Sequence, residues 1–265
     1  MAKPVFLITP TVDMAKQQKQ AQALDLELVD QWTANTPFLH LVDGALTLSV
    51  CTPGSASPLS VFVDFITFRH TLKPAGNKQR LLLRAVKTRQ SDHVSILDAT
   101  GGLGRDSFLL AQAGHDVIVL EQNRIVFALL ADGLERGMRQ EQTRETCRRM
   151  ACHCCEAAAY ILQRQPRVEV IYLDPMFPKR GKSGKAKQQL QVLQYLLPHR
   201  DNDCRLLSSA WAVRPQKIVV KRPLKGPHLC HLAPEYTLRG KTIRYDVYTP
   251  VSRKNPFSTD QIPIR

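Results

Sequence analysis

The chain has 265 residues, of which 43% are hydrophobic, so it is long enough for a full buried core and too apolar for wholesale disorder. Lysine and arginine outnumber aspartate and glutamate by 37 to 23, a formal net charge of +14. Such an excess attracts polyanions, of which nucleic acid is the commonest large one, although an ordinary basic surface is the simpler alternative. No apolar run suits a secretory leader or a membrane span, so we expect an intracellular, cytoplasmic protein.

The seven cysteines form an odd set, four of them between residues 147 and 155. Without a secretion signal, a disulfide framework is not expected. Cys152 and Cys155 form a Cys-x-x-Cys pair that residues 228–231, His-Leu-Cys-His, could complete as a zinc site. A second Cys-x-x-Cys pair is missing, so we expect no metal and interpret the cysteines as small buried thiols.

Residues 1–75 contain short apolar runs separated by turn-forming residues. This pattern predicts a small mixed α/β N-terminal domain made of short strands and turns. The expected strands lie within residues 5–10, 24–29, 45–50 and 61–68.

Residues 76–265 alternate strand-like and helical segments. Strands are expected within 94–100, 116–122, 148–154, 168–175 and 216–223, and helices within 77–86, 105–114, 124–138, 156–163 and 185–197. This alternation predicts an α/β fold with a doubly wound, Rossmann-like parallel sheet. Ligands of such sheets bind beyond the carboxyl ends of the strands, where this sequence places acids and glycines.

The segment LDATGGLGRD, residues 97–106, joins the first of these strands to its helix. Its glycines allow the backbone to approach a ligand closely. The dinucleotide fingerprint Gly-x-Gly-x-x-Gly fails at its third position, because Gly102 and Gly104 are followed by Ser107. S-adenosylmethionine methyltransferases carry an acid followed by small residues two, four and six positions later, which Asp98 and this loop match with one substitution. A loop of this kind is a weak signal alone, and it could be only a tight turn with Asp106 at the start of the helix.

Glu121 ends the next strand, 23 residues after Asp98. In either cofactor class, an acid at this place can accept hydrogen bonds from ribose hydroxyls.

The segment DPMFP, residues 174–178, follows the fourth strand of the sheet. Asp174 can accept a hydrogen bond from an exocyclic amino group, and Pro175 restricts the direction of the loop. Phe177 offers a flat face on which a base can stack. These residues are the candidate catalytic group.

Together, the segments LDATGGLGRD, VLEQN, ADGLERG, YLDPMFP, VVKRP and RYDVYTPV resemble one family, the bacterial ribosomal small-subunit methyltransferases J. The resemblance runs from about residue 61 to residue 251 and implies a class I methyltransferase sheet over residues 76–265. It further implies S-adenosylmethionine as cofactor and the N2 of a guanine in 16S ribosomal RNA as substrate.

The resemblance also implies cofactor-binding positions. These are Arg105 and Asp106, Glu121 and Gln122, Cys154 and Cys155, and Asp174, with Asp98, Gly102 and Gly104 shaping the loop. Two departures stand out: the family has a Ser pair at Cys154 and Cys155, and most of its Arg- and Gly-rich loop after residues 63–65 is replaced here.

Basic residues follow the candidate catalytic group. Lys179, Arg180, Lys182, Lys185 and Lys187 are expected to contact RNA phosphates, although a solvated surface is the alternative for such a run. Lys221 and Arg222 end the fifth strand and either contact phosphate or pair with Asp174 and neighbouring acids.

The prediction is therefore an rRNA guanine-N2 methyltransferase that acts on 16S ribosomal RNA or the small subunit. The alternatives are an adenine-N6 methyltransferase acting on DNA or RNA, an NAD-dependent oxidoreductase, and a non-catalytic RNA-binding protein.

Overall fold

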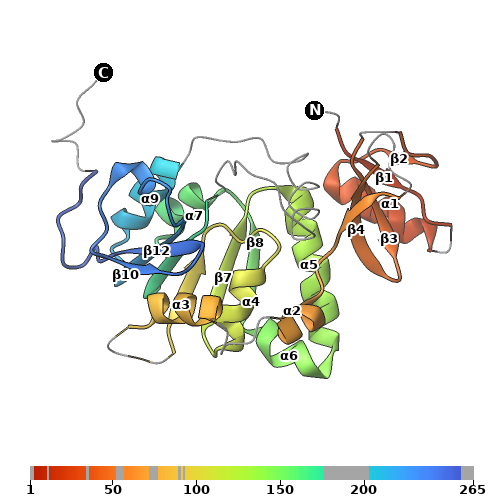
Figure 1. Ribbon diagram of the computed structural model, residues 1–265. Helices are drawn as coiled ribbons and strands as arrows, with labels where there is room; N and C mark the ends of the chain where they lie inside the picture. Colours follow the sequence, from red (N-terminus) through yellow and green to blue (C-terminus); the bar gives the residue numbers. More distant parts are fainter. Residues whose placement is uncertain are drawn as a thin grey trace, which may run out of the picture.

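The computed structural model (Figure 1) describes residues 3–10, 12–33, 36–51, 57–71, 77–88, 91, 93–175 and 203–257. Within these ranges, no helix has the length and apolar character needed to cross a membrane.

The N-terminal part forms a five-stranded sheet with one helix. Its elements are β1 (Val5–Leu7), α1 (Met14–Leu24), β2 (Leu28–Val29), β3 (Phe38–Val42), β4 (Ala45–Val50) and β5 (Leu59–Val61), in the sheet order β2-β1-β3-β4-β5. Strands β3 and β4 are joined by Asp43 and Gly44, whose φ angles of 49° and 79° suit the two-residue turn of a hairpin. An N-cap also starts α1, because the Asp13 carboxylate accepts a hydrogen bond from the Ala15 N–H.

Two of the expected N-terminal strands are wrong over most of their length. Residues 61–68 contain only the end of β5, and helix α2 (Phe65–Thr71) follows because the Asp64 side chain accepts hydrogen bonds from the N–H groups of Ile66 and Thr67. Residues 24–29 begin with the end of α1, a helix that the apolar pattern did not indicate, and only Leu28–Val29 is strand.

The second sheet has seven strands in the order β11-β12-β10-β9-β6-β7-β8. Its strands are β6 (Ser95–Asp98), β7 (Asp116–Glu121), β8 (Met150–Cys154), β9 (Val170–Leu173), β10 (Lys217–Pro223), β11 (Tyr236–Arg239) and β12 (Ile243–Tyr248). The five expected strands are present and parallel to one another. Strands β11 and β12 were not expected; β12 pairs antiparallel with β10, and β11 pairs antiparallel with β12, so the two strands extend the sheet beyond β10.

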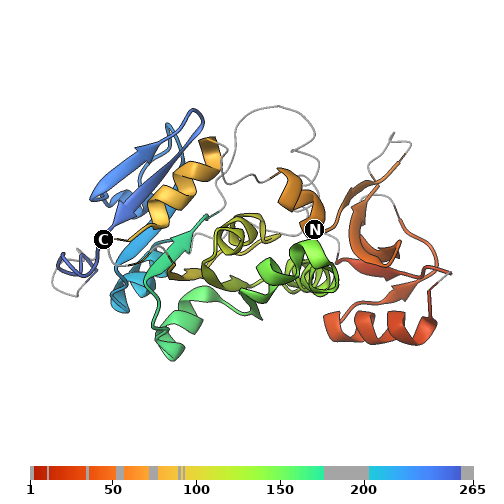
Figure 2. The same ribbon diagram turned by 90° about the horizontal axis from the view of Figure 1, so that it is seen from below.

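Helices cover both faces of this sheet (Figure 2). They are α3 (Asn77–Val86), α4 (Arg105–Gln112), α5 (Arg124–Arg139), α6 (Glu141–Arg148), α7 (Ala157–Arg164) and α9 (Asp203–Ala212), with a 3-10 turn, η1 (Leu229–His231). Helices α3 to α6 pack on one face, and α7 and α9 pack together on the other. The helix expected within residues 185–197 lies outside the described residues.

Strand β9 shows how the sequence builds these two layers. Val170 and Tyr172 point to one apolar cluster, whereas Ile171 and Leu173 point to the other, as the two-residue period of a strand requires. All four side chains are buried, which explains why the strand is continuously apolar rather than alternating.

The N-terminal sheet lies beside α5 (Figure 1) and shares the larger apolar cluster with the second sheet. The Asp132 carboxylate accepts hydrogen bonds from the Leu46 N–H at 3.1 Å and from Arg136 Nε at 2.8 Å, and Arg136 Nη2 donates to the Val63 carbonyl at 2.5 Å. Gly133 allows the close approach, since a Cβ there would lie 2.4 Å from Val63 Cγ1. The expected domain boundary near residue 75 falls within residues 72–76, outside the described residues, and stays a prediction.

Replacing Gly133 by alanine should therefore lower the free energy of unfolding by about 1–3 kcal/mol, because the added methyl group overpacks the contact with Val63. Alanine in place of glycine usually stabilises a helix by about 1 kcal/mol, but this gain is too small to offset the overlap with the Cβ and Cγ1 atoms of Val63. Urea denaturation followed by circular dichroism measures the effect. Gly226→Ala is the matched control, because its Cβ would come no closer than 3.4 Å to Pro223; a loss of similar size there would contradict the explanation.

Candidate functional site

The site lies where the strand order of the larger sheet reverses. Strand β6 pairs with β7 on one side and with β9 on the other, and all three are parallel, so their carboxyl ends meet at one edge of the sheet, where ligands of such sheets bind. Asp98 ends β6, Glu121 ends β7, and Asp174 directly follows β9. Three carboxylates from distant parts of the chain therefore meet at one edge of the sheet.

The glycine loop after β6 is held close against β7. The Gly101 N–H donates to the Leu120 carbonyl at 2.8 Å, and a Cβ on Gly101 would lie 2.4 Å from Val119 Cγ1. Gly102 and Gly104 have φ angles of 54° and 75°, in the left-handed region that favours glycine. Gly104 is also the residue from which α4 starts. The loop thus needs glycine for both its conformation and its packing.

Asp98 is a buried anchor of this loop. One carboxylate oxygen accepts the Thr100 N–H at 3.0 Å, and the other accepts the Ser107 hydroxyl at 2.5 Å. Burial raises the pKa of Asp98 to about 7, against the lowering effect of these hydrogen bonds. With 1% of its surface exposed, Asp98 lies beneath the loop, and its role in cofactor binding stays a prediction.

Glu121 connects the loop to the next strand. Its carboxylate accepts hydrogen bonds from the Gly102 N–H at 2.9 Å and from the Asn123 N–H at 2.7 Å. Burial raises the pKa of Glu121, and the backbone donors only partly oppose this effect. Gln122 follows with an exposed side chain at the same edge. The role expected for these two residues in cofactor binding stays a prediction.

Asp174 lies in an ion-pair cluster with Lys221 and Asp106. The Lys221 ammonium contacts Asp106 Oδ2 at 2.6 Å and Asp174 Oδ2 at 2.7 Å, so one cation bridges two carboxylates. The Tyr172 hydroxyl also donates to Asp106 Oδ2 at 2.6 Å, and the Asp174 N–H donates to Thr100 Oγ1 at 2.7 Å. Of the two alternatives for Lys221, the structure shows the pairing with acids.

The charges in this cluster stabilise one another. Burial favours the neutral forms, but the attraction between opposite charges prevails: the pKa of Asp106 is lowered and that of Lys221 is raised. Burial and the neighbouring Asp106 raise the pKa of Tyr172 well above its usual value. At neutral pH the cluster therefore contains charged Asp106 and Lys221 and a neutral tyrosine donor.

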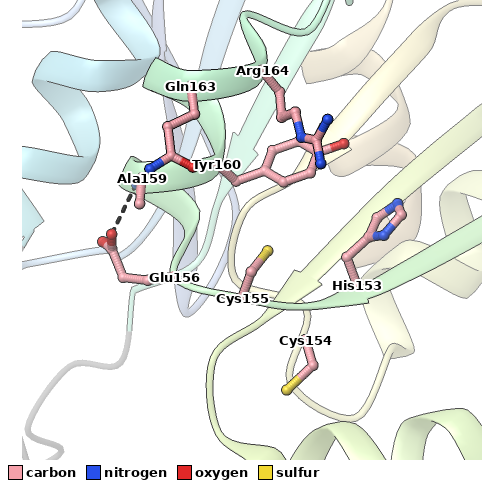
Figure 3. A pocket seen from close by; sticks show the side chains of 8 residues that line it. All are labelled: His153, Cys154, Cys155, Glu156, Ala159, Tyr160, Gln163 and Arg164. Carbon is pink, nitrogen blue, oxygen red and sulfur yellow. Dashed lines mark hydrogen bonds between the residues drawn. The ribbon is translucent and has the colours of Figure 1, made fainter.

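Cys154 and Cys155 lie at the end of β8, where the Cys155 N–H donates to the Glu121 carbonyl at 3.1 Å. Figure 3 shows their side chains pointing in different directions, with the Cys155 sulfur toward Tyr160. They border a hollow of about 330 Å³ that is lined by His153, Cys154, Cys155, Glu156, Ala159, Tyr160, Gln163 and Arg164. Burial raises the pKa of both thiols, so they are predominantly protonated at neutral pH.

The expectation of buried thiols is only partly correct. Cys51 and Cys147 are buried and Cys152 and Cys155 are half-buried, but Cys154 is exposed. Cys204 and Cys230 form a disulfide that the sequence reasoning did not anticipate, because η1 brings residue 230 against α9. In the described part of the chain, no group of three or more potential ligands could hold a metal ion.

The remaining predicted site residues divide into three groups. Pro175 follows Asp174 within the described residues, whereas Phe177, Lys179, Arg180, Lys182, Lys185 and Lys187 lie outside them. Arg105 is exposed, with its guanidinium 4.6 Å from the centre of the Phe68 ring. Arg222 is buried and donates through Nε and Nη2 to the Pro227 carbonyl, so it supports the loop after β10.

Ser107 and Tyr172 were not expected in the site, and Thr100 was expected only as one of the small residues of the glycine loop. Ser107 was considered only as a failed glycine position, although a hydroxyl in the first turn of the helix can reach an acid at the strand end. Tyr172 was interpreted only as part of an apolar, buried strand. Its hydroxyl was the available signal, because a buried tyrosine usually has a hydrogen-bond partner.

Comparisons with known proteins show the family to which the chain belongs. The family described as "Putative SAM-dependent methyltransferase" matches residues 19–250. The ribosomal RNA small subunit methyltransferase J of Thioalkalivibrio sulfidiphilus is 39% identical over 233 residues, covering 86% of this chain and 90% of the relative. The protein of the same name from Coxiella burnetii (strain Dugway 5J108-111) is 34% identical over 237 residues, covering 89% and 92%. The crystal structure of a SAM-dependent methyltransferase from Neisseria gonorrhoeae aligns with a TM-score of 0.74 at 29% identity, covering 95% of this chain and 98% of that one.

The buried Asp98 should make stability depend on pH. Its pKa is about 7 in the folded state against 3.8 as the ordinary value, so between these pH values the folded state holds a proton that the unfolded chain has released. Its contribution to stability is therefore lost as the pH rises from about 4 to about 7, by at most about 4 kcal/mol. In Asp98→Asn this loss should be absent. Urea denaturation from pH 5 to pH 8 measures the unfolding free energy of both proteins. As the pH rises, the wild type should lose stability relative to Asp98→Asn. A constant difference would show that Asp98 does not titrate in this range.

Proposed function

This chain belongs to the family of SAM-dependent methyltransferases that includes the ribosomal RNA small subunit methyltransferases J, and we propose that it methylates the exocyclic N2 of a guanine in 16S ribosomal RNA. The observation that carries the proposal is the meeting of the carboxyl ends of β6, β7 and β9 at one edge of the sheet. There a glycine loop and the carboxylates of Glu121, Asp106 and Asp174 come together.

The chemistry of these residues fits S-adenosylmethionine. Glu121 is the proposed acceptor for the ribose hydroxyls, and its hydrogen bond with the Gly102 N–H keeps the loop backbone close to it. Asp106 and Asp174 provide negative charge for a cofactor that carries an ammonium and a sulfonium group. When bound, S-adenosylmethionine supplies an electrophilic methyl group.

Asp174 is the proposed partner of the substrate amine. Its carboxylate accepts an N–H of the amino group and so directs the nitrogen lone pair toward the methyl carbon; Phe177 stacks on the base. The new C–N bond forms as the C–S bond breaks, the bonding pair leaves with sulfur, and the surplus amine proton passes to solvent. Because such an amine needs little deprotonation before attack, the chain's main contribution is positioning.

The RNA substrate is supported by the names of the relatives and by the net charge of +14. Lys179, Arg180, Lys182 and Lys185 are the proposed phosphate contacts, for which Lys221 and Arg222 were also candidates. An adenine-N6 methyltransferase is the alternative in the same class, since its substrate also presents an exocyclic amine.

Titration calorimetry should detect binding of S-adenosylmethionine and none of NAD. Glu121→Ala should weaken that binding about tenfold or more, because it removes a charged hydrogen-bond acceptor worth about 1.5–3 kcal/mol. Glu145→Ala is the control, since Glu145 is an exposed carboxylate with 80% of its side chain accessible. Equal affinities of the wild type and Glu121→Ala would remove Glu121 from the cofactor site.

Methyl transfer to small-subunit ribosomal RNA, as naked RNA and as assembled particles, tests the reaction itself. Mass spectrometry of the nucleosides should find N2-methylguanosine, whereas N6-methyladenosine would establish the alternative. Asp174→Ala should lower kcat about 100-fold or more, because the amine loses its orienting partner. Asp116→Ala, at an exposed carboxylate paired with Arg149, should retain wild-type activity; an active Asp174→Ala would contradict the assigned role.

A further inference from the structure

We propose that Lys221 is a positioning residue, which keeps Asp174 ionised and fixed in place so that Asp174 can accept the N–H of the substrate amine. The inference rests on the proposed function for the identity of that amine. It assigns to Lys221 a role inside the site instead of a contact with RNA phosphate.

The geometry places Lys221 between two acids from different elements. Its ammonium comes from β10, Asp106 from the first turn of α4, and Asp174 from the end of β9, at N–O distances of 2.6 and 2.7 Å. Only 23% of the Lys221 side chain is exposed, against 38% for Asp174. Lys221 therefore faces the acids, and Asp174 is the more accessible member of their pair.

Two carboxylates that share one site need such a cation. Without it, repulsion and burial would cause one of them to take up a proton near neutral pH. The ionised form of Asp106 would still be stabilised by the hydrogen bond from the Tyr172 hydroxyl, by the nearby positive charge of Arg105 and by its place at the start of α4. We therefore expect the proton to go to Asp174, which would then no longer be a pure acceptor for the amine.

Within the described residues, the titratable groups around Asp174 include Asp98 on β6, Tyr172 on β9 and Tyr245 on β12, and none of these three can supply a positive charge. Burial raises the pKa of both tyrosines, so they stay neutral. Burial also raises the pKa of Asp98 to about 7, and its ionisation adds negative charge. Among these neighbours within the described residues, Lys221 provides the positive charge.

Lys221 is not itself the base of the reaction. The two carboxylates raise its pKa, so it stays protonated over the whole range in which the protein would be assayed. Its effect on catalysis must therefore pass through Asp174, which distinguishes it from a group that touches the substrate.

The experiment compares pH profiles of kcat/KM between pH 5.5 and 9 for the wild type, Lys221→Met and Lys221→Arg. In Lys221→Met the protonation of Asp174 near neutral pH should move the acid limb to higher pH, so that activity falls about tenfold at pH 6 and recovers toward pH 8.5. Lys221→Arg keeps the charge and should follow the wild-type profile. Lys217→Met makes the same substitution at the other end of β10 and should leave the profile unchanged.

A second measurement needs neither cofactor nor RNA. Carbon-13 NMR of labelled aspartate carboxyls, with Asp174 assigned through Asp174→Asn, reports the pKa of Asp174 directly. It should rise by one unit or more in Lys221→Met. Lys221→Gln, which keeps a hydrogen-bond donor but no charge, should give the same rise if Lys221→Met does not fold.

An unchanged Asp174 pKa, or a uniform loss of activity at every pH, would overturn the role of Lys221 even if the wild type methylates RNA. A raised Asp174 pKa in Lys221→Met would support that role even if no RNA were methylated. In that case the proposed function would be wrong, whereas the role of Lys221 in setting the pKa of Asp174 would stand.

Discussion

The reversal of strand order at β6 is the constraint on which the site depends. Because β7 and β9 lie on opposite sides of β6 and run parallel to it, their carboxyl ends converge without any loop having to reach across the sheet. Asp98, Glu121 and Asp174 are 76 residues apart at the extremes, yet they need only short extensions from buried strands to share one edge. The rigidity of the layers beneath, with all four residues of β9 buried, fixes their separation.

Carboxylates that lie close together and partly buried at one edge destabilise one another's charged forms, and two kinds of contact reduce this effect. Asp98 and Glu121 accept hydrogen bonds from backbone and hydroxyl donors of the glycine loop, which oppose only part of the rise in pKa that burial causes. Asp106 and Asp174 are instead bridged by the ammonium of Lys221. The first pair organises the backbone, whereas the second leaves negative charge beside the place where the cationic cofactor is proposed to bind.

Much of this arrangement could be predicted from the sequence, because it follows from local patterns. Strands β6, β7, β9 and β10 contain runs of buried apolar residues, and Asp98, Glu121 and Asp174 lie at or directly after the ends of three of them. The helix α2 was missed because its start depends on the Asp64 cap rather than on the apolar pattern. Strands β11 and β12 were missed because their pairing is set by the edge of β10.

The contacts within the site were harder to predict. Sequence spacing left two partners open for Lys221, and only the packing of β10 against β9 places it between Asp106 and Asp174. In the same way, the hydroxyls of Ser107 and Tyr172 acquire their roles from side chains that meet across elements. The disulfide between Cys204 and Cys230 likewise depends on the turn that follows β10.

The apolar cluster shared by the two sheets has a consequence for folding. Phe6 and Leu39 of the N-terminal sheet belong to the same continuous core as Ile96 and Val219 of the larger one, and α5 lies between the two sheets. Exposing one part would also expose apolar surface of the other, which links their unfolding free energies. The chain should therefore melt as one cooperative unit, with a single calorimetric transition for both sheets.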